Sequence, residues 1–231
     1  MKTSSKLFLI LLGICFVSLT NCKTSAIRVP DPGTEAEIQT QTVYGFTIFK
    51  VRKNLLSEHP FSLHGKDLVF VSQTNPQNTN APELPIQSTS LDSYHVLLGQ
   101  TNLRYILSEI AWTEVCGNNC VLKFHANLNP EESKLALPLE GKPGEIRFLG
   151  VFYLHLSPQG NLKNDFKGKL EEGYSQFEDD SLESFKPHIF ENPQNISLKS
   201  SEIKFLKSFV QLQKDGYWKN KAEEKLNALL K

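Results

Sequence analysis

The stretch IRFLGVFYLHL, at residues 146–156, decides the fold class of this chain. Successive side chains of a strand point to opposite faces, and here both faces are apolar apart from Arg147, Tyr153 and His155. Such a run predicts a central strand covered on both sides. Gly150 lies within the run and predicts a β-bulge or a close approach of another backbone.

Similar short segments recur on the N-terminal side of this strand, at intervals of roughly 10 to 20 residues, divided by Gly, Pro and Asn. Short strands divided by turn residues in this way are typical of a β-sandwich or a β-barrel. We expect a mainly β fold, an antiparallel β-sandwich over residues 43–157. The predicted strands are 43–51 (VYGFTIFKV), 68–71 (LVFV), 94–98 (YHVLL), 104–115 (RYILSEIAWTEV), 120–128 (CVLKFHANL) and, more weakly, 135–139 (LALPL).

Polar segments surround these strands. Residues 72–93 are rich in Asn, Gln, Pro, Ser and Thr and predict a long, disordered loop. Residues 158–199 mix both charges and predict a charged connector. Residues 200–231 predict a C-terminal helical pair, interrupted at Asp215–Gly216. We expect the pair to pack on the sandwich or on itself, and the alternative is a helix for a partner or a membrane surface.

The N-terminus has the pattern of a secretory signal peptide over residues 1–21. Lys2 and Lys6 precede an apolar run of 13 residues at 7–19, which ends in a polar stretch. The run is too short to cross a hydrocarbon core of ~30 Å, which argues against an uncleaved signal anchor.

Cys22 follows the predicted cleavage point directly and resembles the lipobox cysteine of bacterial lipoproteins, which takes up lipid and becomes the new N-terminus. Leu19 has the usual position three residues earlier, whereas Asn21 replaces the common small residue, as in the relaxed lipobox of spirochaetes. We expect lipidation at Cys22, a flexible tether over residues 22–42 and attachment to the cell envelope, at the outer rather than the inner membrane. The alternative is an ordinary cleavage near Ser25–Ala26, which releases a periplasmic protein.

Cys116 and Cys120 are the other two cysteines of the mature chain. The intervening Gly-Asn-Asn is a turn sequence between apolar strands, so the two thiols would face each other across a hairpin. In an exported protein such a pair predicts a disulfide. Alternatives are a redox-active pair and a zinc site with His125. The CxxxC spacing disfavours the first, and a regular strand points His125 away from Cys120.

Composition and motifs indicate no chemistry. The chain has 25 basic and 25 acidic residues. This balance gives no net positive charge that would predict binding to nucleic acid, and no basic patch that would predict binding to anionic lipid. Its six histidines are scattered, and it has no HExxH, GxSxG, Walker A or GxGxxG sequence. We therefore predict no catalytic residue, no metal site and no cofactor.

Residues 144–151, GEIRFLGV, resemble a "PGEIxFLGxY" strand of small β-sandwich envelope lipoproteins of the spirochaete (Leptospira) type. Glu202, Phe205, Leu206 and the Trp218, Ala222, Leu226 stripe resemble the helical tail of such proteins. The resemblance covers the signal, one strand and the tail. It implies a location and a fold, and it implies no catalytic residue.

The sequence therefore predicts a lipid-anchored envelope protein, a non-enzymatic module that displays a β domain to a protein or small ligand. Two alternatives are an envelope enzyme without a recognisable motif and a subunit of an envelope assembly. A cleft that collects a histidine with carboxylates would favour the enzyme, and a large exposed apolar patch would favour the assembly.

Overall fold

The computed structural model of the chain describes residues 28–53, 58–62, 67–72, 82–88, 94–117, 120–129, 135–137, 142–158, 165–175 and 198–231. The helices are α2 (Glu35–Ile38), α3 (Leu198–Leu212) and α4 (Tyr217–Leu229). The strands are β1 (Gln41–Lys53), β2 (Glu58–Ser62), β3 (Asp67–Ser72), β4 (Glu83–Ser88), β5 (Tyr94–Gln100), β6 (Tyr105–Gly117), β7 (Cys120–Leu128), β8 (Ala136–Leu137), β9 (Ile146–Pro158) and β10 (Asp165–Ser175).

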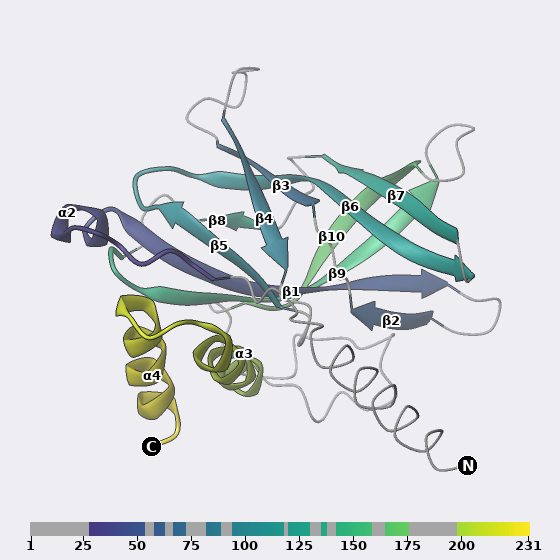
Figure 1. Cartoon of the computed structure of the whole chain (residues 1–231). Helices are drawn as coiled ribbons and strands as arrows, with labels where there is room; N and C mark the ends of the chain where they lie inside the picture. The colour runs from purple at the N-terminus through teal and green to yellow at the C-terminus, as the bar shows by residue number, and fades with distance from the viewer. Residues whose placement is uncertain are drawn as a thin grey trace, which may run out of the picture.

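The mainly β fold is confirmed, but the predicted sandwich of two sheets is not what forms. Across the described ranges, the strands make one sheet in the order β1-β5-β4-β3-β6-β7-β10-β9, and β9 pairs with β1 again. The sheet therefore closes on itself in a barrel-like shape (Figure 1). The pairs β1–β9 and β7–β10 are parallel, and the others in this circuit are antiparallel.

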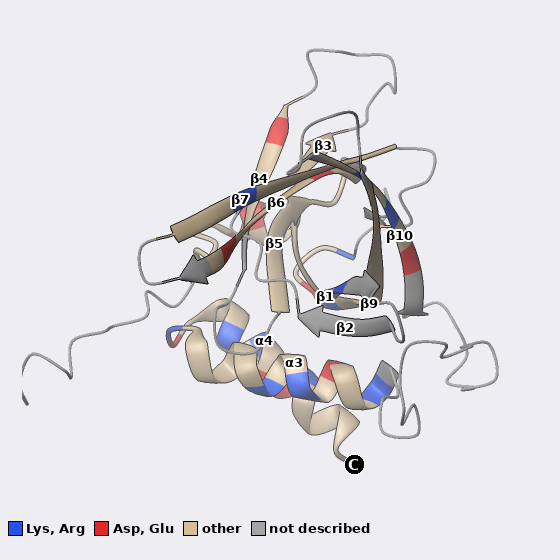
Figure 2. Cartoon of the chain, turned by 90° about the vertical axis from the view of Figure 1, so that its right-hand side faces the viewer, with Lys and Arg blue, Asp and Glu red and all other residues tan. Residues whose placement is uncertain are grey.

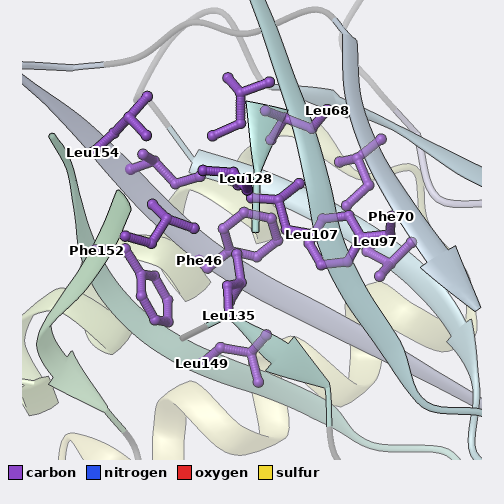
Figure 3. Close-up of a cluster of buried hydrophobic side chains, with 14 of the residues drawn as sticks. Phe46, Leu68, Phe70, Leu97, Leu107, Leu128, Leu135, Leu149, Phe152 and Leu154 are labelled. Atoms are coloured by element: carbon purple, nitrogen blue, oxygen red, sulfur yellow. The ribbon is translucent and has the colours of Figure 1, made fainter. Parts of the chain in front are cut away.

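Two apolar cores lie on the two faces of this closed sheet. The inner core fills the interior with side chains from opposite walls, among them Phe46 of β1, Phe70 of β3 and Leu154 of β9 (Figure 3). The outer core lies between the sheet and helices α3 and α4. β9 contributes to both cores, with Phe152 in the inner and Tyr153 in the outer one. The prediction of a strand covered on both faces is thereby confirmed.

Gly150 marks a β-bulge, as its position in the sequence predicts. Gly45 and Phe46 of β1 are consecutive, yet they face Phe148 and Gly150 of β9, so Leu149 is the extra residue. Gly150 has a φ of 130°, a conformation that residues with a side chain rarely adopt. The bulge changes which face the following residues present, so that Phe148 and Val151 both reach the outer core.

The C-terminal helical pair is confirmed and covers the outside of the sheet at β1, β5 and β9 (Figures 1 and 2). Phe205 and Leu206 of α3 are fully buried there, as are Trp218 and Ala222 of α4. The break falls at Gly216, where the Asp31 carboxylate occupies the space that a Cβ would need. The expectation that the helices pack on the β domain and on each other is correct.

The predicted tether over residues 22–42 is wrong for its described part, because residues 28–42 belong to the folded domain. Val29 is buried in the outer core, and its backbone N–H and carbonyl both bond the side chain of Gln213, at 3.0 and 2.6 Å. The backbone N–H of Trp218 donates to Asp31 Oδ1 at 3.0 Å. A residue near the start of the described chain thus supplies the N-terminal cap of α4. Helix α2 and the start of β1 follow at once.

Two further predictions of irregular structure are wrong in part. Residues 83–88, within the predicted loop 72–93, form β4 between β3 and β5. Residues 165–175, within the predicted connector 158–199, form β10, which pairs with β9 and β7 and completes the closed sheet. In β10 the inward positions Gly168 and Leu170 are buried, and Lys167 and Lys169 point outward. Apart from residues 72, 82, 158, 198 and 199, the rest of both segments lies outside the described residues.

Candidate functional site

Cys22, the predicted lipidation site, lies outside the described residues, and the described chain begins at Arg28. The segment that starts there is firmly attached to the C-terminal helices. The Trp218 indole N–H donates to the Pro30 carbonyl at 3.0 Å, beside the bonds of Val29 and Asp31 described above. The first described residues are therefore held against α3 and α4 at several points.

Cys120 is disulfide-bonded. Its side chain is exposed at the start of β7, and Gly117 at the end of β6 pairs with it across the hairpin. The Cys116 side chain lies outside the described residues, so the pairing of Cys116 with Cys120 stays a prediction. Around this hairpin tip Val115 and Val121 are 81% and 60% exposed, an unusual exposure for apolar side chains.

His125 lies on the outer face of β7, opposite to the buried Ala126, and its Nε2 lies beside the Glu109 carboxylate of β6. A second such pair brings His155 of β9 to Glu171 of β10, with 3.2 Å between Nε2 and Oε2. Within the part of the chain that the structure describes, no group of three or more potential metal ligands occurs.

A groove of about 700 Å³ lies between α2, the turn before β9 and α4. We call it the α2–α4 groove. Its apolar lining includes Ile38, Pro143 and Ile146. Its charged lining consists of Glu35, Glu145, Lys221, Glu224 and Lys225. The groove combines apolar walls with charges of both signs, a composition that suits a ligand with polar groups at several points.

Bonds between distant segments fix the floor of this groove. The Tyr217 hydroxyl donates to the Gly144 carbonyl at 3.2 Å, and a Cβ at Gly144, which has a φ of 72°, would collide with that hydroxyl. Lys225 Nζ lies 2.6 Å from Glu202 Oε1 and donates to the Ile146 carbonyl at 2.9 Å. Lys221 pairs with Glu224 at 2.9 Å, and this hydrogen bond raises the pKa of the Lys221 ammonium.

A second polar cluster connects two walls of the closed sheet. Lys50 of β1 pairs with Glu114 of β6, and its Nζ lies 5.2 Å from the centre of the Trp112 ring. The Trp112 indole N–H donates to the same Glu114 oxygen at 3.2 Å, and the Phe124 ring stacks on Trp112 at a centroid distance of 5.4 Å. These contacts hold a cation, a carboxylate and two aromatic rings together, as a structural clamp between β1 and β6.

Two buried phenols, Tyr44 and Tyr105, belong to the inner core. Burial raises the pKa of Tyr44 in β1, and Arg147 offsets part of that rise. Burial also raises the pKa of Tyr105 in β6. Gly99 lies close to both rings, because a Cβ there would be 3.0 Å from Tyr44 and 3.3 Å from Tyr105.

The sequence did not predict the α2–α4 groove. Its walls come from three segments that only the tertiary fold brings together, and none of them carries a recognisable binding motif. The sole local signal was the Pro143–Gly144 turn, which is compatible with many ordinary connections.

Comparison of the chain with models of protein families, with curated proteins and with solved structures finds no match. Among the described residues, no helix has both the length and the apolar character needed to cross a membrane.

Proposed function

We propose that this chain is a lipid-anchored protein of the cell envelope and that its β domain is a non-enzymatic binding module. The lipid would be attached at Cys22, after removal of residues 1–21, and the outer membrane would be the membrane that holds it. The protein would bind a protein or a small ligand there, and nucleic acid is not an expected partner.

The observation that carries this proposal is the position of Cys22 relative to the folded domain. A signal-like run ends in Leu-Thr-Asn-Cys, and a few residues later the chain is bonded to α3 and α4 through Val29 and Asp31. A lipid at Cys22 would therefore hold a folded domain directly at a membrane. The resemblance to envelope lipoproteins of the spirochaete type agrees with this location.

The α2–α4 groove is the surface that we propose for the partner. It is open, and its charged groups include Lys221 and Glu224. The interior of the closed sheet is a packed apolar core and is not proposed as a binding cavity. A groove on the outside with a filled interior is the arrangement of a binding module on a rigid scaffold.

A second candidate function, a subunit of an envelope assembly, is favoured by the tip of the β6–β7 hairpin. Val115, Val121 and Leu122 are exposed there beside the disulfide-bonded Cys120. An enzyme is favoured less, since neither His–Glu pair, His125–Glu109 or His155–Glu171, lines the α2–α4 groove.

Proteolysis of intact cells, with total membranes as the control, tests the location. In a high-salt wash, wild-type protein should remain with the membranes, whereas Cys22→Ala should be released into the soluble fraction. Cleavage in intact cells would place the partner outside the cell, and cleavage only after the outer membrane is opened would place it in the periplasm. Membrane association of Cys22→Ala that persists at high salt, where the attraction between lysines and lipid is screened, would contradict the proposed anchor.

Photo-crosslinking tests the groove. A photoreactive amino acid at Gln39 or Ala228, both of which line the groove, should form a discrete adduct in cells. The same amino acid at exposed Lys123 of β7 is the matched control. Equal adducts at all three positions, or none at Gln39 and Ala228, would contradict the proposed site.

A further inference from the structure

The chain between the proposed anchor and the folded domain is short. From Cys22 to Arg28 there are six residues, which reach at most about 22 Å when fully extended. Val29 is bonded to Gln213 just after the end of α3, so the point of attachment lies next to this helix. A lipid at Cys22 would thus keep α3 close to the bilayer, whatever path the six residues take.

The face of α3 that points away from the sheet is basic. Lys199, Lys204 and Lys207 are exposed along it, and Lys214 continues the face after the last turn. Arg28, at the start of the described chain, is exposed as well. Figure 2 shows basic segments along α3, which lies outside the strands. We call the four lysines the α3 basic face.

The nearby acidic residues are largely engaged by other lysines. Glu202 of α3 pairs with Lys225, and Asp215 pairs with Lys219, both at 2.6 Å. In all, residues 198–231 hold eight lysines and four acidic residues, whereas residues 22–197 hold 15 basic and 21 acidic residues. The near-neutral composition therefore conceals a separation of charge, which total charge alone could not reveal.

A shallow hollow of about 370 Å³ lies within this face, lined by Tyr94, Lys204, Lys207 and Ser208. The two lysines are three residues apart on the helix and therefore lie on the same side. The Tyr94 ring packs edge-on against Phe205, which fixes the floor of the hollow. The ammonium groups of Lys204 and Lys207, beside the hydroxyl-bearing Ser208, provide charged donors of the kind that bind a phosphate.

We propose that the α3 basic face lies on an anionic lipid surface and that the hollow receives lipid phosphate groups. This inference rests on the proposed function, because the lipid at Cys22 supplies the proximity. Lysines near an anionic leaflet are attracted to it within about a Debye length of ~8 Å, a distance that the short link allows. The contact would orient the domain so that β6 and β7 lie farther from the membrane than α3 and α4 (Figure 2).

Lysine footprinting on the full-length, lipidated protein tests the contact. The protein is placed in vesicles of phosphatidylcholine alone, in vesicles that also contain phosphatidylglycerol, and in detergent micelles, and is then acetylated. We expect Lys204 and Lys207 to react several-fold more slowly in the anionic vesicles than in the other two samples. Lys123, exposed on β7, should react equally in all three. Equal reactivity of Lys204 and Lys207 in neutral and anionic vesicles would overturn the proposal.

A charge reversal distinguishes the contribution of the α3 basic face to membrane binding from that of the lipid anchor. In full-length protein with Cys22→Ala, binding to anionic relative to neutral vesicles should fall at least about tenfold in Lys204→Glu/Lys207→Glu. The matched variant, Lys123→Glu/Lys169→Glu, changes the same charge on the strands and should leave the ratio unchanged. Equal ratios for the two double variants would overturn the proposal.

The proposed lipid anchor and the proposed membrane contact of the α3 basic face are tested by different measurements. If the wild-type protein, purified from its cell membranes, does not float with neutral vesicles, the lipid anchor is absent and the proposed function fails. The anionic-to-neutral binding ratios of the Cys22→Ala variants are measured without the lipid, and the difference between the two double variants reports on the α3 basic face.

Discussion

The ring of Phe205 lies directly over Gly45, where α3 crosses β1. A Cβ built on Gly45 would overlap three carbons of that ring. The ring also stacks on Phe148 of β9 at a centroid distance of 5.5 Å. The absence of a side chain at Gly45 thus lets the helix come close enough to cover two adjacent, parallel strands, β1 and β9.

Replacement of Gly45 by Ala should displace Phe205 and lower the free energy of unfolding by about 1–3 kcal/mol. Phe205→Ala alone should cost about 3–5 kcal/mol. In the double variant, Gly45→Ala should cost much less than it does alone, because the ring is gone. Urea unfolding of the four proteins measures this coupling. Gly33→Ala, whose Cβ would meet only Glu37 at 3.6 Å, is the control. Additive effects at Gly45 and Phe205 would contradict the contact.

Gln213→Ala should loosen the N-terminal segment. The buried N–H and carbonyl of Val29 would lose their partner, which costs about 1–3 kcal/mol. We expect this as a local release, seen as faster tryptic cleavage after Arg28. Gln211→Ala, at an exposed position two residues earlier, should leave the rate unchanged. Identical cleavage rates in the two variants would show that residues 28–31 are not held in this way.

Lys50→Met should lower the free energy of unfolding by about 1 kcal/mol, since Glu114 is left without its cation in a half-exposed position. The emission of Trp112 should change as well, because the ammonium lies over its ring. Lys50→Met/Glu114→Gln should recover most of the stability. If the double variant is as unstable as Lys50→Met, the pair does not stabilise the clamp.

Alkaline pH should destabilise the fold through Tyr44 and Tyr105. Burial raises the pKa of both phenols in the folded state, so the folded chain holds their protons more tightly than the unfolded chain. Their contribution is present below the unfolded pKa of about 10 and is lost as the pH rises through the folded pKa. Urea unfolding at about pH 8 and about pH 11 should show a smaller loss in Tyr44→Phe/Tyr105→Phe than in wild type. An equal loss in both proteins would assign the effect to other groups.

Cys116→Ser/Cys120→Ser should cost only about 2 kcal/mol, since the disulfide predicted between them closes a loop of a few residues. The intact mass of the wild type should rise by two hydrogens on reduction under denaturing conditions. Reduction should shift the unfolding midpoint of the wild type to that of the double variant and leave the variant itself unchanged. An unchanged wild-type mass on reduction would contradict the bridge.

The sequence predicted those features that depend on local pattern. The two-sided apolar run at 146–156, the bulge at Gly150 and the break at Gly216 each follow from residues near them in the chain. In Cys120–Leu128 the alternation of side chains places Ala126 and Leu128 on one face, where both are buried, whereas Leu122 on the same face is 39% exposed, because that end of the hairpin extends past the inner core.

Features that depend on distant partners could not be predicted. A sandwich and a closed sheet share the same alternating strands, and closure follows from the parallel pairing of β1 with β9, about 100 residues apart. β10 was missed because charged residues fill its outer face and leave Phe166, Leu170 and Tyr174 as isolated apolar or aromatic signals. Val29 alone gives no local indication that Gln213 will hold it. The α2–α4 groove likewise arises from segments without a local signal.

The lipid anchor at Cys22, on which the proposed function depends, is best measured as the mass of the N-terminal peptide of the mature protein isolated from its cell membranes. We predict a peptide that begins at Cys22 and carries the added mass of acyl chains. Alkaline hydrolysis, which removes ester-linked chains, should reduce this mass. A peptide that begins near Ala26, or one that retains Met1, would contradict the proposed anchor.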